Sequence, residues 1–300
     1  MVAVDRCRVC GSEQFEDRFS EPPYTIRRCQ TCGFVWVTPR MEEAELVALY
    51  GEGYWRSDSP KTVGYADYRA DADLYLKTFR RRLNHVLRGT AHQGARPPGS
   101  QARALEVGCA AGYCLEVLAE RGFDVHGVEL SAAIGAEAQR RVGTERIHIG
   151  TLDTAPYKPE SFDLIMLWDV VEHVVDPHAL LRQARALLAP KGMLVLETQD
   201  AESTFARLLG QRWHHYKHAE HLSHFTPSTI RRVLKDTGFE VKDLTHHYAG
   251  KYVSADFVAE RSARLHPALS EVLTPLAERL EGRSVYVNVF DEMVVRAKGA

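Results

Sequence analysis

The segment ALEVGCAAGYCLEVL, at residues 104–118, constrains the fold of this chain more than any other. It begins as a short apolar run, passes through a turn that carries Gly108 and Gly112, and resumes as a helical pattern from Tyr113. This order predicts a strand, a tight turn and a helix. Glycine at such a turn permits unusual backbone angles and lets a ligand approach closely, and the following helix offers unpaired N–H groups.

The spacing of the two glycines distinguishes this turn from the common phosphate-binding loops. The pattern is G-x-x-x-G, which matches neither G-x-G-x-x-G nor the P-loop, and no lysine follows to hold a phosphate. Glu106 stands two residues before Gly108, where its charge would repel a pyrophosphate but could hold a cationic or hydroxyl-bearing ligand. An ordinary strand–helix turn is the alternative on this motif alone.

Strands and helices alternate after the turn, which favours an α/β fold with a parallel sheet. Helices are predicted to begin at Ser131, at Asp176-Pro177 and at Thr226-Pro227, because these residues suit the first positions of a helix. The further strands are expected at residues 123–128, 147–149, 161–167, 193–198, 240–244 and 285–295. Glu129 ends the second strand 21 residues after Gly108, a position that fits a carboxylate binding ribose hydroxyls.

These motifs together resemble those of a known family. E-x-G-x-x-x-G after a first strand resembles motif I of class I S-adenosylmethionine (SAM) methyltransferases, and Phe-Asp before the fourth strand and L-x-P-x-G-x-L from Leu188 are similar to later motifs of that family. The resemblance implies an α/β, Rossmann-like, seven-stranded sheet with helices on both faces, over residues 101–300. It assigns SAM binding to Glu106, Gly108, Cys109, Ala110, Gly112, Tyr113, Glu129, Leu130, Leu152, Asp153, Trp168 and Asp169.

Four cysteines near the N-terminus form two C-x-x-C-G knuckles. Cys7 and Cys10 are followed, after 18 intervening residues, by Cys29 and Cys32, which is the spacing of a four-thiolate zinc site. Four thiolates leave no open coordination position, so this zinc would be structural. A redox pair is the alternative, which the duplicated knuckle disfavours. The sequence therefore predicts a small zinc ribbon at residues 1–40.

Residues 41–100 form an aromatic-rich, mostly helical segment that ends in a linker rich in glycine and proline. Tyr54 and Trp55 lie in its first half, and a long helix is predicted from about residue 67 to 87. The aromatic side chains have two interpretations. They either pack between helices or form a lid over the cofactor, whose sulfonium cation suits aromatic faces.

Two histidine-containing clusters follow strands four and five, where ligands bind in open α/β sheets. The first contains Asp169, Glu172 and His173. The second lies in a predicted substrate-binding insertion at about residues 199–226, and five histidines fall within residues 213–225. Methyl transfer needs a deprotonated acceptor, and a histidine suits that task.

Two catalytic schemes stay open from these clusters. In one, His221 is the base, helped by Glu220 or His173. In the other, Asp169, Glu172 and His173 bind a divalent ion that lowers the pKa of the acceptor. D-x-x-E-H is similar to the E-x-x-E-H of ubiquinone-pathway O-methyltransferases. The Glu220-His221-Leu-Ser-His-Phe run with the four cysteines more closely resembles deoxysugar C-methyltransferases, in which the Glu-His pair lies in the site.

Composition narrows the functional class. The formal net charge is -2, with 38 Lys+Arg against 40 Asp+Glu, which disfavours a dedicated nucleic-acid binder. No apolar run is long enough to span a membrane, and no signal peptide is recognised, so we expect a cytoplasmic protein with reduced cysteines. We predict methyl transfer to a small-molecule acceptor, a sugar or secondary-metabolite hydroxyl or carbon. An RNA methyltransferase and a non-catalytic SAM-binding partner protein are the alternatives, and oligomeric state is not predicted.

Overall fold

The computed structural model describes residues 1–58, 63–88, 101–255 and 283–300, together with residues 258, 271, 274, 275 and 279. Most of the predicted linker after residue 88 lies outside these ranges. Among the described residues, none of the helices combines the length and the apolar character needed to cross a membrane.

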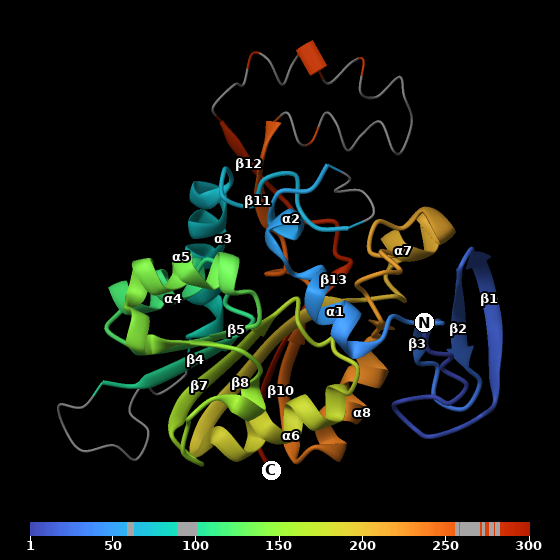
Figure 1. The fold of residues 1–300 in the computed structure, drawn as a ribbon, viewed down its shortest axis with the longest axis horizontal. Coiled ribbons are helices and arrows are strands. Elements are labelled where there is room, and N and C mark those ends of the chain that lie inside the picture. The colour runs from blue at the N-terminus through green and yellow to red at the C-terminus, as the bar shows by residue number, and fades with distance from the viewer. Residues whose placement is uncertain are drawn as a thin grey trace.

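A seven-stranded sheet forms the centre of the molecule, in the order β10-β13-β8-β7-β4-β5-β6 (Figure 1). Its strands are β4 (Arg103–Val107), β5 (Asp124–Glu129), β6 (Ile147–Ile149), β7 (Phe162–Trp168), β8 (Leu188–Gln199), β10 (Phe239–Thr245) and β13 (Glu292–Gly299). β4 pairs in parallel with β5 and β7, and β7 pairs in parallel with β8, whereas β13 is antiparallel to both β8 and β10. This confirms the predicted Rossmann-like sheet.

Helices cover both faces of the sheet, as predicted. Ala104 of β4 packs in one cluster of buried side chains and its neighbour Leu105 packs in the other, because successive side chains of a strand point to opposite faces. The helices on the first face are α3 (Ala72–Val86), α4 (Tyr113–Glu120) and α5 (Ala132–Val142). Those on the second face are α6 (Pro177–Leu187) and α8 (Pro227–Asp236).

Two of the three predicted helix starts are confirmed by their capping contacts. The Asp176 carboxylate accepts a hydrogen bond from the backbone N–H of Ala179 at 2.9 Å, and the Thr226 hydroxyl accepts one from the N–H of Thr229 at 3.2 Å. Ser131 precedes α5 as expected, but its hydroxyl oxygen accepts a bond from the indole of Trp55 instead of capping the helix. The aromatic segment is thereby fixed to the end of β5.

The predicted strand at residues 285–295 is divided into two. β12 (Ser284–Val287) pairs with β11 (Lys251–Ser254) in a separate ribbon, and the last strand of the central sheet begins only at Glu292. The cause is a turn in which the Asn288 side-chain oxygen accepts a bond from the N–H of Phe290 at 2.8 Å, with Phe290 at a φ of 60°. Asparagine favours such turns because its side chain mimics the backbone.

The N-terminal ribbon is an antiparallel sheet whose last strand comes from the distant insertion. β1 (Phe15–Glu21), β2 (Tyr24–Cys29) and β3 (Val35–Thr38) pair in sequence order, and β9 (Ser223–His224) pairs with β3. Figure 1 shows this ribbon at one side of the main sheet. The segment that carries the second histidine cluster is thus part of the ribbon's own sheet.

Short helices connect these parts. They are α1 (Glu43–Leu49), α2 (Glu52–Trp55) and α7 (Thr204–Leu209), with 3-10 turns η1 (Thr144–Arg146), η2 (Leu152–Thr154) and η3 (Gly210–Arg212). The predicted long helix begins at Ala72, later than expected, because the Asp67 carboxylate first forms a turn by accepting bonds from the N–H groups of Arg69 and Ala70.

Candidate active site

The glycine turn after β4 has the backbone that its sequence predicts. Gly108 and Gly112 have φ values of 72° and 79°, and Ala110 has a φ of 46°. A Cβ on Gly108 would lie 2.7 Å from the side chain of Val170, and one on Gly112 would lie 3.1 Å from that of Ala138. Both positions therefore need glycine for backbone conformation and for space.

The Glu129 carboxylate ties the end of β5 to this turn. Its two oxygens accept hydrogen bonds from the backbone N–H groups of Ala110 and Ser131, each at 2.8 Å. Burial raises the pKa of Glu129, and these backbone donors act in the opposite direction. Each oxygen keeps a second lone pair, so the carboxylate can still accept bonds from two hydroxyl groups.

Two carboxylates beside the turn each have a buried oxygen without a protein donor in the described part of the chain. These oxygens are Oε2 of Glu106, on β4, and Oδ1 of Asp169, directly after β7. Burial, with repulsion from Glu129, raises the pKa of Glu106 well above its usual value. A ligand with hydroxyl or ammonium groups would satisfy such atoms, so this edge of the sheet fits a nucleoside and amino-acid ligand.

The other residues assigned to the cofactor lie around the same edge. Asp153 is exposed, whereas Leu152 is buried beside it in η2. Tyr113 stacks on Tyr75 with ring centroids 5.5 Å apart. Trp168 ends β7, and Cys109, Ala110, Leu130 and Tyr113 follow β4 or β5.

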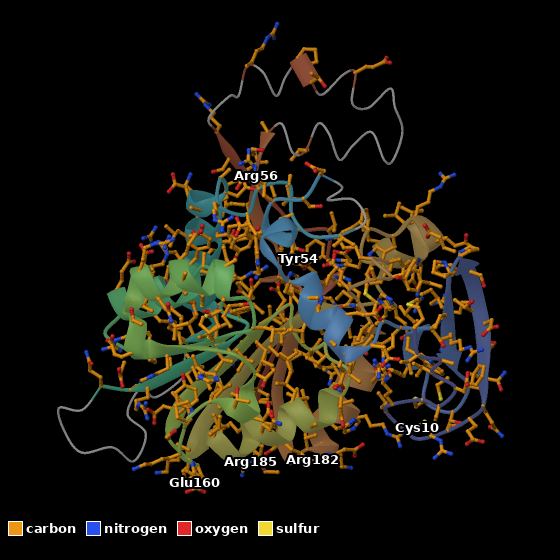
Figure 2. The ribbon with its side chains drawn as sticks, in the orientation of Figure 1. Cys10, Tyr54, Arg56, Glu160, Arg182 and Arg185 are labelled. Carbon is orange, nitrogen blue, oxygen red and sulfur yellow. The ribbon has the colours of Figure 1, made fainter. Side chains whose placement is uncertain are left out.

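The aromatic segment packs over the helices that follow the turn. Trp55 donates to Ser131 at 3.0 Å, and Tyr68 stacks on Tyr113 with centroids 5.7 Å apart. Tyr54, which projects from α2 in Figure 2, and Tyr65 also line the cavity described next. The segment is therefore at once a packing layer and a wall of the cavity.

A cavity of about 620 Å³ lies next to the carboxyl end of β7. Asp169, His173 and His221 line it, together with the aromatic segment and β11. Because β7 is the neighbour of β4 in the sheet, the cavity borders the edge that carries the glycine turn. Its size is that of a small-molecule site.

His221 is held in one tautomer. Its Nδ1 lies 2.7 Å from the backbone carbonyl oxygen of His215. A carbonyl can only accept, so Nδ1 carries the proton and Nε2 carries a lone pair. Burial and the nearby His173 lower the pKa of His221 well below its usual value, so the ring is neutral near pH 7.

Glu220 is fully buried, and its carboxylate contacts Tyr54 and Lys217 instead of its sequence neighbour His221. Its Oε2 accepts a hydrogen bond from the Tyr54 hydroxyl at 2.5 Å, and its Oε1 lies 2.8 Å from the Lys217 ammonium. The sequence allowed Glu220 to orient His221, but the group that orients the His221 ring is the backbone carbonyl of His215. Glu220 instead joins the aromatic segment to the insertion.

The two predicted histidine clusters lie together in space. The rings of His173 and His221 are 4.7 Å apart, and the carbonyl of Glu172 accepts bonds from the N–H groups of Leu222 and Ser223. His173 Nδ1 lies 3.1 Å from the Tyr50 hydroxyl, and burial lowers the pKa of His173.

The group of described residues that could hold an ion here differs from the predicted one. It consists of Glu172, His173 and His221, with ligand atoms within 4.8 Å of one another. The predicted ligand Asp169 lies outside this group. Its backbone has a φ of 52°, and the charges that act on it are Lys251, Arg82 and Glu292.

Sequence reasoning missed the buried charges beneath the cavity. Arg82 of α3 and Glu197 of β8 form a buried pair, and the exposed Lys251 of β11 pairs with the buried Glu292 of β13 at 2.9 Å in the cavity wall. The signal was Glu197 itself, an acidic residue inside the apolar run of a central strand, which is seldom buried without a partner.

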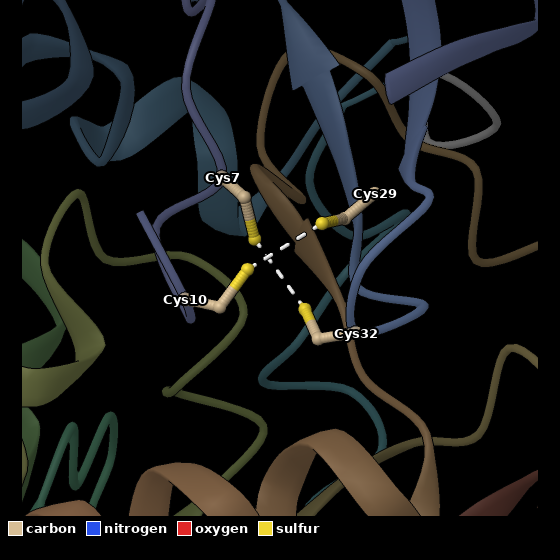
Figure 3. Close-up of side chains that lie close together, drawn as sticks. All are labelled: Cys7, Cys10, Cys29 and Cys32. Atoms are coloured by element: carbon tan, nitrogen blue, oxygen red, sulfur yellow. Dashed lines mark hydrogen bonds between the residues drawn. The ribbon is translucent and has the colours of Figure 1, made fainter. Parts of the chain in front are cut away.

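The four ribbon cysteines converge on one point (Figure 3). The sulfur atoms of Cys7 and Cys32 are 3.6 Å apart, those of Cys10 and Cys29 are 3.5 Å apart, and all four lie within 4.8 Å of one another. Tetrahedral zinc with bonds of about 2.3 Å separates its sulfur ligands by roughly 3.8 Å. The donor set therefore fits the predicted structural zinc.

Comparison with known proteins identifies relatives of the chain. Residues 76–244 match the family model described as a methyltransferase domain. The ubiquinone biosynthesis O-methyltransferase of Xanthomonas campestris pv. campestris is 28% identical over 219 residues, which cover 68% of this chain and 82% of that protein. The same enzyme from Xanthomonas euvesicatoria is 28% identical over 160 residues, and the match covers 48% of this chain and 65% of that relative.

Solved structures show the same fold. Magnesium protoporphyrin IX methyltransferase from Synechocystis, solved with bound SAH, has a TM-score of 0.53 at 14% identity, over 86% of this chain and 100% of that one. A methyltransferase of Haloferax volcanii, solved with a methyltransferase activator, has a TM-score of 0.51 at 16% identity, over 85% of this chain and 97% of that one.

Proposed function

Because the chain belongs to the methyltransferase-domain family and is a SAM-dependent enzyme, we propose that it methylates a hydroxyl oxygen of a small molecule held in the cavity beside His221. The acceptor would be a sugar or a phenolic secondary metabolite. An oxygen acceptor is favoured over carbon because the Xanthomonas relatives are named O-methyltransferases.

One observation carries the proposal. His221 lines the cavity, and the bond from its Nδ1 to the His215 carbonyl leaves the lone pair on Nε2. A neutral imidazole with a fixed tautomer is suited to accept a proton from a hydroxyl group. The proton of the acceptor hydroxyl would therefore move to His221 Nε2 as the oxygen becomes a nucleophile.

The cofactor would bind at the carboxyl edge of the central sheet, beside the cavity. The backbone from Gly108 to Gly112 would approach it, Glu129 would accept bonds from the ribose hydroxyls, and Leu152 with Asp153 would flank the adenine. When bound, SAM supplies an electrophilic methyl group on a cationic sulfonium. Glu106 and Asp169 each carry a buried oxygen with no donor among the described residues, and these oxygens suit its charged part.

His173 and Glu220 would support His221 in different ways. His173 packs edge to face against the His221 ring, which limits rotation of that ring. Glu220 anchors the insertion to Tyr54 and so sets the position of the loop that carries His221. Both would act as positioning residues, and the base itself would be His221.

A divalent ion at Glu172, His173 and His221 is the alternative chemistry for the same residues. The two roles exclude each other for His221 if Nε2 is its ligand atom, because one lone pair cannot bind an ion and accept a proton. A methyl-transfer rate that persists after chelation of loosely bound ions would favour the base.

The experiment is methyl transfer from labelled SAM to a panel of sugars, catechols and RNA, with binding of S-adenosylhomocysteine measured separately. We expect at least one hydroxyl compound to be methylated. Glu129→Ala should weaken S-adenosylhomocysteine binding by more than tenfold, whereas Glu43→Ala, at an exposed site on α1, should not. Methylation of RNA alone, or cofactor binding without turnover on any hydroxyl compound, would overturn the proposal.

A further inference from the structure

We propose that His214, His215 and Asp291 form a second metal site, for a zinc-like divalent transition-metal ion, in the wall of the cavity. All three residues line the cavity. They come from two distant segments: the histidines follow η3 in the insertion, and Asp291 lies directly before β13. The site is distinct from the four-cysteine ribbon and from the group of Glu172, His173 and His221.

The spacing of the ligand atoms fits one ion. The Nε2 atoms of His214 and His215 lie 3.6 and 3.7 Å from the same carboxylate oxygen, Oδ2 of Asp291. An ion with bonds of 2.0–2.2 Å in tetrahedral geometry would place its ligands roughly 3.4 Å apart. The two nitrogen–oxygen distances exceed this separation by only a few tenths of an ångström, and the ligand atoms of all three residues lie within 4.8 Å of one another.

The hydrogen bonding of the His215 side chain is incomplete. Its Nε2 is buried and has no hydrogen-bond partner among the described residues. It is aimed at two carboxylates, Asp291 at 3.7 Å and Glu292 at 3.5 Å, and both distances are too long for a good hydrogen bond. A cation between the ring nitrogen and the carboxylate would satisfy both groups.

Outer contacts hold Asp291 in place for this role. The Trp213 indole donates a hydrogen bond to Asp291 Oδ2 at 2.8 Å, and the backbone carbonyl of Asp291 accepts one from the N–H of Asp200 at 2.7 Å. Such outer hydrogen bonds orient the carboxylate ligands of metal ions. Of the two carboxylates near His215, Glu292 is paired with Lys251, so Asp291 is the one that remains for the ion.

Two histidines and one carboxylate are a donor set typical of ions that keep open coordination positions. Three protein ligands leave room for a further oxygen on the cavity side. This one step rests on the proposed function: the oxygen would then belong to the hydroxyl group that receives the methyl group. The ion would then lie next to His221, since the carbonyl of His215 is the group that fixes the His221 ring.

The test is metal stoichiometry on the full chain, with the ribbon already loaded with Zn²⁺. Titration with Co²⁺, followed by calorimetry and by visible absorption, should show one additional equivalent. His214→Ala should weaken this binding by at least tenfold, and Asp291→Asn should do the same. His247→Ala, an exposed histidine outside the cavity, should bind Co²⁺ as the wild type does.

Two results would overturn the site. One is the absence of any equivalent beyond the ribbon ion. The other is an additional ion that is lost in Glu172→Gln but kept in His214→Ala, which would place it at the first histidine cluster. His214 is half-exposed, so His214→Ala should stay folded by circular dichroism even if the buried Asp291 variant does not. The readout is binding, so it stands whether or not methyl transfer is found.

Discussion

The imidazole Nδ1 of His221 lies 2.7 Å from the backbone carbonyl oxygen of His215. This contact decides which nitrogen of His221 can accept a proton. Because the hydrogen-bond acceptor is a backbone carbonyl, no single side-chain substitution removes it. The proposed base and the carbonyl that orients it both lie in the insertion between β8 and α8. The central sheet supplies the cofactor edge, and the insertion supplies the chemistry of the acceptor.

His221→Ala should abolish turnover while leaving cofactor binding intact. Removal of a general base lowers the rate by about 10²–10⁴-fold, and the cofactor edge is built from other residues. The measurement is kcat together with the affinity for S-adenosylhomocysteine, with His247→Ala as the matched control. Near-normal turnover in His221→Ala would contradict the assignment of the base.

The pH profile should reflect the lowered pKa of His221. Burial disfavours the charged imidazolium, so His221 stays neutral at pH values below the usual histidine pKa of about 6.5. We therefore expect kcat/KM to stay level from pH 8 through 6.5 and to fall only in more acidic solution. A half-maximal rate near pH 6.5 would show instead that an unshifted group controls the reaction.

Tyr54→Phe should weaken the link between the aromatic segment and the insertion. The phenylalanine ring keeps the contacts with Tyr50 and Trp55, but Glu220 loses its hydroxyl donor in a buried position. The free energy of unfolding should fall by roughly 1–3 kcal/mol, measured by urea denaturation. Tyr157→Phe, which removes a bond to the neutral carbonyl of Gly127, should cost less, and equal losses would speak against a special role of Glu220.

Local sequence signals were sufficient to predict the central fold. Gly108 and Gly112 are required by positive φ values, and Asp176 and Thr226 cap helices through contacts within three residues. In the first half of β5, half-buried and buried positions alternate from Asp124 to Gly127, as the period of a strand requires. Each of these features is encoded within a short segment, so a single sequence reveals it.

Features that depend on distant residues were not predictable in the same way. Val35 pairs with His224, and no local pattern indicates that a strand of the ribbon and the insertion that carries His221 share a sheet. The division of the last strand depends on the Asn288 side chain bonding to Phe290, a turn that the apolar pattern of the segment concealed. Asp169 was grouped with Glu172 and His173 by spacing, whereas the ligand atoms that converge with those two residues include His221, which is distant in sequence.

Cys10→Ser should reduce turnover although Cys10 lies in the ribbon. Loss of one thiolate should remove the predicted structural zinc and loosen the ribbon. β3 would then no longer hold β9, the strand that directly follows the segment carrying His221. We expect lower zinc content by mass spectrometry and a lower kcat, with S-adenosylhomocysteine binding preserved. A zinc-free protein with full activity would show that the ribbon and the insertion are independent.

Arg82→Met should destabilise the protein strongly. The substitution leaves the fully buried Glu197 without its cationic partner, and breaking a buried pair in this way costs about 3–5 kcal/mol. The double variant with Glu197→Leu should recover a large part of that loss, because no unpaired charge is left. Urea denaturation of both variants tests this, and a double variant as unstable as Arg82→Met would point to the lost bond between Arg82 and the Ala249 carbonyl instead.

Acid should destabilise the fold through His224, which joins the ribbon to the insertion. Burial, with the nearby charges of His218 and Arg18, lowers the pKa of His224 to about 3, and its Nδ1 lies 3.3 Å from the side-chain nitrogen of Gln199, which donates to it. The unfolded chain binds this proton near pH 6.5 and the folded chain only near pH 3. Between these values the unfolded state holds more protons, so stability falls as the pH is lowered, by roughly 1 kcal/mol for each pH unit.

His224→Phe removes this titration while keeping a ring in the buried site. Its free energy of unfolding should therefore decline less steeply than that of the wild type between pH 6.5 and pH 4. The buried His215 and His221, whose pKa values are also lowered, should leave a residual slope in the variant. Urea denaturation at a series of pH values measures both slopes, and identical slopes would mean that His224 is already protonated in the folded protein.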